Sequence, residues 1–169
     1  MPTFDFNDGK GPVPAHQHPN GGGWVADTAY VSNTAHVGRK ARVYGNARIS
    51  GNTQIGGYAQ VYGDAQVFEK ARVYGNAQVF EKARVYGNAL VYENALVYGD
   101  AEVFEKARVY GHTQVCGNMK IGGNEGAYLT KREITTSVAN KDYPHSCPKC
   151  KSPAYIGFTK IDCSNNCGA

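Results

Sequence analysis

The chain lacks a long apolar run: no stretch approaches the length of about 18 residues that a membrane-spanning helix needs. Its first twenty residues also lack the basic segment and the apolar segment of a signal peptide. Charged residues make up only 19% of the chain, and the net charge is +4. That balance permits contact with nucleic acid without requiring it, and it excludes an acidic mimic of DNA. We therefore expect no membrane contact.

Cysteine is scarce outside the last 23 residues, which hold four of the five cysteines. They form two close pairs, Cys147 with Cys150 and Cys163 with Cys167, and this spacing favours metal ligands in a reducing compartment over disulfides. Four thiolates close a tetrahedral site around Zn²⁺ and leave no open position, so the predicted zinc is structural. We therefore expect a cytoplasmic location.

The two cysteine pairs resemble a zinc ribbon, although the second pair has three intervening residues instead of the usual two. Zinc ribbons commonly bind protein or nucleic acid, and both partners stay open here. Three lysines would give this module a modest basic surface: Lys149, Lys151 and Lys160.

Glycine is abundant, with 21 residues, and it takes part in a repeat of six. Val or Ile occupies every sixth position from Val25 to Ile121, seventeen times without an insertion. A small residue, nearly always Ala, stands two positions earlier. A typical unit is Ala-Arg-Val-Tyr-Gly-Asn at 71–76, which predicts a short strand followed by a corner.

Strand geometry directs Ala and Val inward, and it directs the residue that follows each of them outward. Gly-Asn, Gly-Asp or Glu-Lys then forms the corner, where positive φ is needed. Three units make one triangular coil of eighteen residues. The sequence therefore predicts an all-β solenoid of five to six coils, with parallel strands, over residues 25–123.

This unit resembles the hexapeptide repeat of left-handed parallel β-helix proteins. That superfamily includes many acyltransferases and the gamma-class carbonic anhydrases and is commonly trimeric, so the resemblance implies a left-handed, trimeric solenoid. One feature departs from it, since an aromatic ring follows the aliphatic residue ten times: Tyr44, Tyr62, Phe68, Tyr74, Phe80, Tyr86, Tyr92, Tyr98, Phe104 and Tyr110.

Residues eighteen apart stack, so the rings fall into three columns, one on each face. The first column has the least charge around it, and we predict that it forms a trimer interface from these residues: Tyr44, Tyr62, Phe80, Tyr98, Gln60, Gln78 and Leu96. Two other interpretations stay open, namely ladders that only stabilise the fold, and a surface for nucleic acid or another partner that includes Arg72, Arg84 and Arg108.

A catalytic role is not favoured by the sequence. The acyltransferases that the repeat resembles use a histidine as general base, often beside loops that interrupt the coils. Here the repeat has no insertion, and His112 at a corner is the one low-ranking candidate. An acyltransferase with His112 at a subunit interface stays open as an alternative, as does a protein that polymerises end to end.

The remaining segments define the expected organisation. Residues 1–24 are rich in Gly and Pro and should wrap over the first coil, with Trp24 covering the open core. Residues 124–146 form a linker or a short capping helix, placed at Ala127–Ala139, and residues 147–169 form the zinc-ribbon-like module. The lead-in Gly-Gly-Gly-Trp-Val-Ala-Asp-Thr-Ala is similar to segments of bacterial and phage-encoded hexapeptide proteins, which suggests a phage-encoded factor that acts on its host.

Together these features predict a non-enzymatic scaffold. A rigid homotrimeric solenoid would present three zinc-ribbon heads, and the linkage of the heads would raise the avidity for a protein or nucleic-acid partner.

Overall fold

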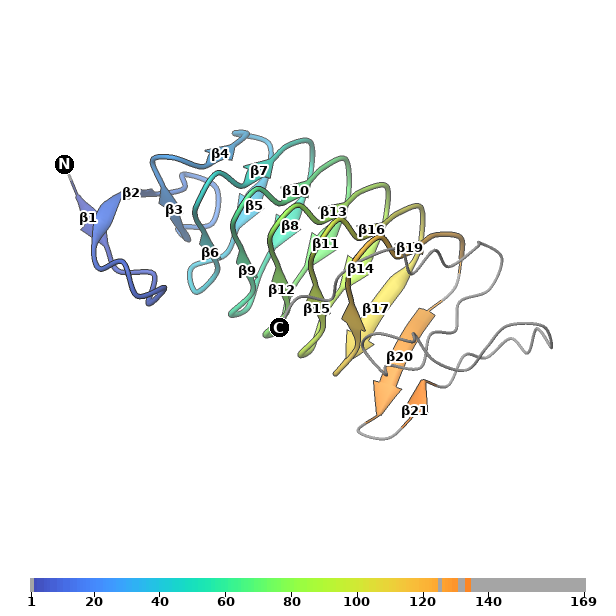
Figure 1. Cartoon of the computed structure of the whole chain (residues 1–169). Coiled ribbons are helices and arrows are strands. Elements are labelled where there is room, and N and C mark those ends of the chain that lie inside the picture. Colours follow the sequence, from blue (N-terminus) through green and yellow to red (C-terminus); the bar gives the residue numbers. More distant parts are fainter. Residues whose placement is uncertain (1, 125, 131–132, 135–169) are drawn as a thin grey trace.

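The computed structural model describes residues 2–124, 126–130 and 133–134, and this part of the chain is a parallel β-solenoid without helices. Short strands turn around one axis and stack in about five turns (Figure 1). A helix of the length and apolarity needed to cross a membrane is likewise not found among these residues.

The strands of the coils are two residues long in nearly every case. They are β3 Trp24–Ala26, β4 Tyr30–Val31, β5 His36–Val37, β6 Arg42–Val43, β7 Arg48–Ile49, β8 Gln54–Ile55, β9 Gln60–Val61, β10 Gln66–Val67, β11 Arg72–Val73, β12 Gln78–Val79, β13 Arg84–Val85, β14 Leu90–Val91, β15 Leu96–Val97, β16 Glu102–Val103, β17 Arg108–Gly111, β18 Gln114–Val115 and β19 Lys120–Ile121.

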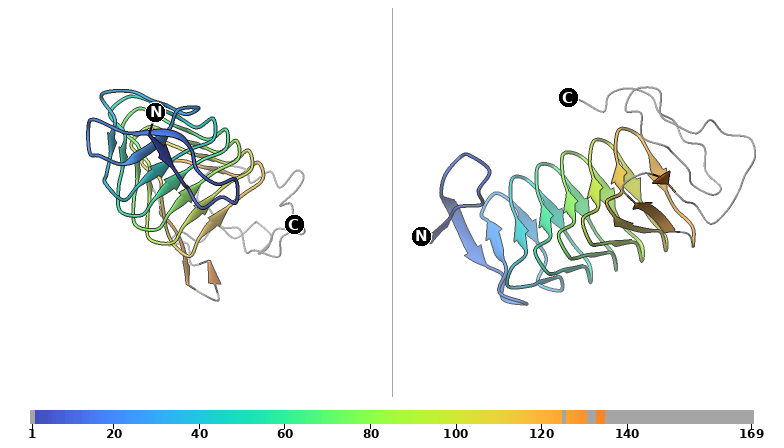
Figure 2. Two further views of the ribbon diagram at one scale, coloured as in Figure 1. Left: turned by 90° about the vertical axis from the view of Figure 1, so that its left-hand side faces the viewer. Right: turned by 90° about the horizontal axis from the view of Figure 1, so that it is seen from below.

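Three parallel sheets form the sides of the solenoid, and consecutive strands belong to different sheets (Figure 2). Sheet 1 contains β3-β6-β9-β12-β15-β18, sheet 2 contains β4-β7-β10-β13-β16-β19, and sheet 3 contains β5-β8-β11-β14-β17. Each strand pairs with the strand eighteen residues on, as Val67 with Val85 and Val79 with Val97. The predicted coil of three repeats is therefore confirmed, whereas the left-handed sense and the hexapeptide superfamily stay predictions.

The core consists of the two inward positions of every repeat. From Ala35 to Val109 the Ala and the Val or Ile at these positions are fully buried, and Thr53 takes the Ala position once. A β-branched residue suits a strand because its stiff side chain packs well against its neighbours along the sheet. Full burial of each such side chain contributes about 1.5–3 kcal/mol, so the stability is spread along the whole solenoid.

The corners depend on a left-handed backbone at their first residue. This residue is usually Gly, as at Gly63 with φ of 70°, but Glu takes the same conformation at Glu69, Glu81, Glu93 and Glu105. The next coil lies close: a Cβ on Gly63 would stand 2.9 Å from the backbone N of Glu81. A carboxylate bridges to the next coil at two of the Glu corners, where Gly99 N–H donates to Glu81 at 2.8 Å and Gly111 N–H donates to Glu93 at 2.9 Å.

The N-terminal segment, residues 2–23, extends sheet 1 with two antiparallel strands. Strand β1, Thr3–Phe4, pairs with β2, Val13–Gln17, and β2 pairs with β3. Residues 20–23 cover the edge of β5, because Val37 N–H donates to Asn20 O and Gly23 N–H donates to Val37 O, each at 2.9 Å. The segment therefore covers strand edges of the first coil, and Gly23 also lies against the core side chain of Val37.

The position expected for Trp24 was wrong. Its neighbour Val25 enters the core, so strand alternation turns Trp24 outward, where it stacks on Phe4 with ring centroids 4.5 Å apart. The short helix expected from Ala127 was also wrong in the part that the structure describes. Residues Gly126–Thr130 form β20, which adds to sheet 3 beside β17, and Glu133–Ile134 form β21. The zinc-ribbon-like module lies outside the described residues.

The corner geometry predicts that an added Cβ changes the free energy of unfolding in opposite directions at two glycines. Gly63→Ala should lower the free energy of unfolding by about 2 kcal/mol, because Ala is strained at positive φ and its Cβ would crowd the next coil. Gly56→Ala should raise it by about 0.5 kcal/mol, because Gly56 has an ordinary φ and a Cβ there would contact only Tyr74, at 3.8 Å. Urea denaturation measures both, and equal effects at the two positions would contradict the corner argument.

Candidate functional site

The outer surfaces of sheets 1, 2 and 3 are named face 1, face 2 and face 3, and each carries one column of stacked rings. On face 1 the centroids of Tyr44, Tyr62, Phe80 and Tyr98 follow one another at 4.8–5.0 Å with nearly parallel planes. The predicted interface residues therefore do lie together on one face. The stacking alone already stabilises neighbouring coils, as expected for same-face neighbours in a sheet.

The choice between Tyr and Phe on face 1 follows a rule that the sequence analysis missed. Each ring reaches the residue sixteen positions on. Tyr44, Tyr62 and Tyr98 donate their hydroxyls to Gln60, Gln78 and Gln114 at 3.0, 3.1 and 3.3 Å. Phe80 has no hydroxyl, and the corresponding residue is Leu96, which has no acceptor.

Face 2 obeys the same rule with more charge. Tyr86 donates its hydroxyl to Glu102 at 3.1 Å, whereas Phe68 and Phe104 have Arg84 and Lys120 at the corresponding positions. Glu102 also lies 3.8 Å from the Arg84 guanidinium and 3.3 Å from the Lys120 ammonium. The outward charges of face 2 thus compensate one another in part.

The N-terminal segment completes the ring column of face 1. Ala26 stands where the next ring of the column would be, and Phe6 fills that space and stacks on Tyr44 at 4.9 Å. Phe6 is 3% exposed and Tyr44 is 8% exposed, so the first rung of the predicted interface is already covered by the chain itself. The Arg42 guanidinium holds this segment by donating to the Phe6 carbonyl at 3.1 Å.

Burial in these columns changes the acidity of the tyrosines. It raises the pKa of Tyr44 to about 12, helped by Tyr62 and Asp8 and opposed by Arg42. Burial likewise raises the pKa of Tyr62, Tyr86 and Tyr92. The pKa of Tyr58 is lowered instead, because the Lys40 ammonium donates to its hydroxyl at 2.9 Å. Tyr44, Tyr62, Tyr86 and Tyr92 are therefore neutral at physiological pH.

Face 3 has an incomplete column. Tyr74, Tyr92 and Tyr110 stack at 5.2 and 5.1 Å, but the two preceding positions are Gly38 and Gly56. The predicted contact residues Arg72 and Arg108 project from this face, whereas Arg84 projects from face 2. The sequence could have shown the gap, because a column of residues eighteen apart contains Gly where rings are expected.

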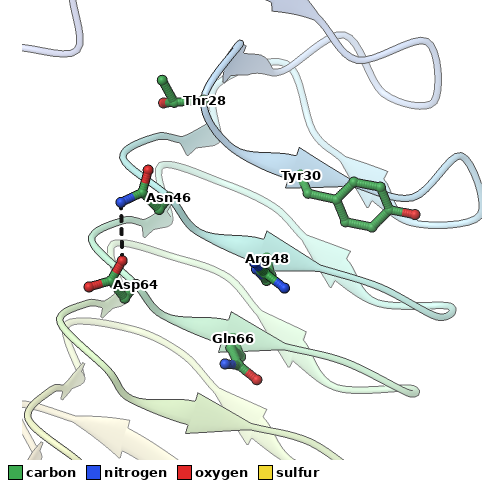
Figure 3. A pocket seen from close by; sticks show the side chains of 6 residues that line it. All are labelled: Thr28, Tyr30, Asn46, Arg48, Asp64 and Gln66. Carbon is green, nitrogen blue, oxygen red and sulfur yellow. Dashed lines mark hydrogen bonds between the residues drawn. The ribbon is translucent and has the colours of Figure 1, made fainter.

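An open pocket of 910 Å³ lies near the N-terminal end of face 2 (Figure 3). It is lined by outward strand residues and by one corner column: Thr28, Tyr30, Asn46, Arg48, Asp64 and Gln66. Asn46 donates to Asp64 at 3.2 Å, so one wall holds an acid opposite the single cation. This mixed lining is polar and weakly charged overall.

The histidines of the described residues are not gathered into one site. His112 is exposed at a corner and His36 is exposed on face 3. His16 lies 2.8 Å from Asp27, and His18 is buried. A group of three His, Cys, Asp or Glu that could hold a metal is not found in the part that the structure describes. The four predicted zinc ligands and Lys149, Lys151 and Lys160 lie outside that part.

The ring rule predicts an energetic coupling between Phe80 and Leu96. Phe80→Tyr would place a hydroxyl beside Leu96 without an acceptor, and Leu96→Gln would place an amide beside a ring without a donor. The double variant should regain about 0.5–1 kcal/mol relative to the sum of the single variants, because it restores the hydrogen bond seen in neighbouring coils. A double-mutant cycle by urea denaturation measures this, and an additive result would refute the rule.

Because Phe6 covers Tyr44, removal of the Phe6 ring should change the acidity of the Tyr44 hydroxyl. Phe6→Ala should lower the pKa of Tyr44 from about 12 toward 10, because the ring that shields it is lost. In the unaltered protein the unfolded state loses this proton first, so the stability should fall as pH rises from 10 to 12. Tyrosinate absorbance, with Tyr44→Phe as the reference that removes this titration, reports the midpoint. An unchanged midpoint in Phe6→Ala would contradict the shielding.

Comparison with known proteins supports the fold. A family model described as the YdcK beta solenoid repeat matches residues 41–57 and 83–99. Both segments begin with Ala-Arg-Val-Tyr-Gly-Asn-Ala, and together they span 34 of the 169 residues. No curated protein and no solved structure matches the chain. The match therefore identifies the repeat as that of a β-solenoid and assigns no activity to it.

Proposed function

We propose that the chain is a non-enzymatic scaffold, a rigid solenoid of the left-handed hexapeptide type. In this proposal three copies associate through face 1 and present the cysteine-rich C-terminal segment to a protein or nucleic-acid partner. Face 1 carries the proposal. From β9 to β18 its outward positions hold rings, glutamines, Leu96 and Cys116 and no charged side chain.

Such a surface has the composition of an interface core. Interface centres are depleted in charged residues and enriched in aromatic residues. The column is also pre-organised, because Tyr44, Tyr62 and Phe80 are each held between two other rings. The tyrosine hydroxyls are fixed by hydrogen bonds within the face. Little side-chain entropy is then lost when a second copy covers it.

The C-terminal segment supplies the proposed binding heads. Cys147, Cys150, Cys163 and Cys167 would hold one structural Zn²⁺, and Lys149, Lys151 and Lys160 would form the contact surface of each head. Three heads on one rigid body act at a high effective concentration, so a weak single contact becomes a strong combined one.

A pair of leucines gives a matched test of the trimer. Leu96 and Leu90 are both outward and partly buried, but Leu96 lies on face 1 and Leu90 on face 3. Leu96→Lys should convert a trimer into monomers in native mass spectrometry, because it places a charge in the proposed interface. Leu90→Lys should leave the trimer intact. A monomeric parent protein, or equal dissociation of the two variants, would refute face 1 as the interface.

The zinc heads are tested in the same instrument. The intact trimer should carry three zinc ions, and a chelator should remove them without dissociating the solenoid, since the metal is expected only in the C-terminal segment. Substitution of Cys150 and Cys163 by Ser should abolish metal binding and leave the subunit count unchanged. A chain that binds no zinc would remove the heads from the proposal.

A further inference from the structure

The ring column of face 3 ends with one side of a ring unstacked. Tyr74 stacks on Tyr92 on one side, with centroids 5.2 Å apart, and its other side is directed toward the coil that carries Gly56. Tyr74 is 40% exposed. Tyr58 lies beside it at the corner, where its backbone N–H donates to the Gly75 carbonyl at 2.7 Å. It is 57% exposed.

The space above Tyr74 is open. A Cβ added to Gly56 would meet only the Cβ of Tyr74, at 3.8 Å, and a Cβ added to Gly38 would meet nothing nearer than 3.4 Å. Both are ordinary van der Waals contacts, and neither glycine has a positive φ. The two glycines are therefore not demanded by the backbone, in contrast to the corner glycines. Together they leave the column positions next to Tyr74 without a side chain, and this gap is named the slot.

Face 1 shows that such a slot accepts a ring from outside the coils. There the column position is Ala26, and Phe6 of the N-terminal segment enters and stacks on Tyr44 with an interplanar angle of 25°. Within the described residues the N-terminal segment does not supply a ring to face 3, because its rings lie on face 1. A planar group from another molecule can take that place.

The surroundings of the slot are basic. The three stacked stretches 36–40, 54–58 and 72–76 contain Arg39, Lys40 and Arg72 and no acidic residue. The corresponding stretches of face 1, 24–28, 42–46 and 60–64, contain two acids and one cation. Glu93, one coil beyond Gly75 at the same corner, uses its carboxylate to accept from Gly111 N–H, on the side away from the slot. A ligand here meets rings and positive charge together.

We propose that this slot binds single-stranded nucleic acid, with one base stacked on Tyr74 over Gly56 and the adjoining phosphates near Arg72 and Lys40. Stacking of bases on aromatic side chains beside a basic track is the general way in which proteins hold single strands. The pocket on face 2 fits a polyanion less well, because Asp64 lies in its wall.

The first experiment fills the slot. Binding of a fluorescein-labelled twelve-nucleotide single-stranded DNA is followed by fluorescence anisotropy at low salt. Gly56→Phe should complete the column, raise the melting temperature and weaken binding at least about tenfold, since one stacked base is lost. Gly56→Ala is the matched control, because it adds a Cβ without a ring and should bind like the parent protein. Retained binding in Gly56→Phe, or equal loss in Gly56→Ala, would overturn the proposal.

The second experiment removes the contacts one by one. Tyr74→Leu should weaken binding about tenfold, and Phe104→Leu, which removes a ring on face 2, should not. Arg72→Gln should reduce the slope of log K against log salt by about 0.7, while Arg84→Gln on face 2 should leave it unchanged. If both arginine variants change the slope equally, the strand does not follow face 3 and the proposal fails.

Two competitors distinguish the source of the ligand. Unlabelled oligonucleotide should displace the probe, and adenosine monophosphate should do so only at far higher concentration, because a single nucleotide engages fewer phosphates. Displacement by the mononucleotide at equal concentration would overturn the assignment to single strands. So would binding of an acidic, tyrosine-containing peptide by a protein that does not bind the oligonucleotide.

Discussion

Everything on the surface of this protein depends on the hydrogen-bonded register between coils. Backbone groups join each strand to the one eighteen residues on, so every side chain has a fixed neighbour above and below it. Columns of like residues follow from that register, and so do the close approach of the corners and the stacking of the rings. The fit of a side chain here depends on its neighbours in the column as much as on its own position in the coil.

The register also explains why the three faces differ although their repeat is the same. On every side one inward position must be small and the other β-branched, which leaves only the outward residues free to vary. Face 1 uses that freedom for rings with amide partners, face 2 for rings with charged partners, and face 3 for rings that begin two coils late. On this view, only the outward residues determine the function of each face.

The sequence could predict the solenoid, its period and its three ring columns, because an uninterrupted repeat makes each coil a copy of the last. The sequence could also have placed Trp24, since Val25 begins the repeat and strand alternation turns the preceding residue outward. It could not show the position of Phe6, whose contact with Tyr44 joins residues far apart in a segment outside the repeat. The helix expected at Ala127 failed because sheet 3 offered an unpaired edge at β17, and pairing outweighed local preference.

One consequence of the three-sided coil concerns changes in chain length. Addition or loss of a single six-residue unit would turn every later residue onto the neighbouring face, and the rings beyond that point would meet the wrong partners. Whole coils can be gained or lost with each column intact. The number of units therefore also sets the side of the solenoid on which the regular repeat ends, here sheet 2 with β19.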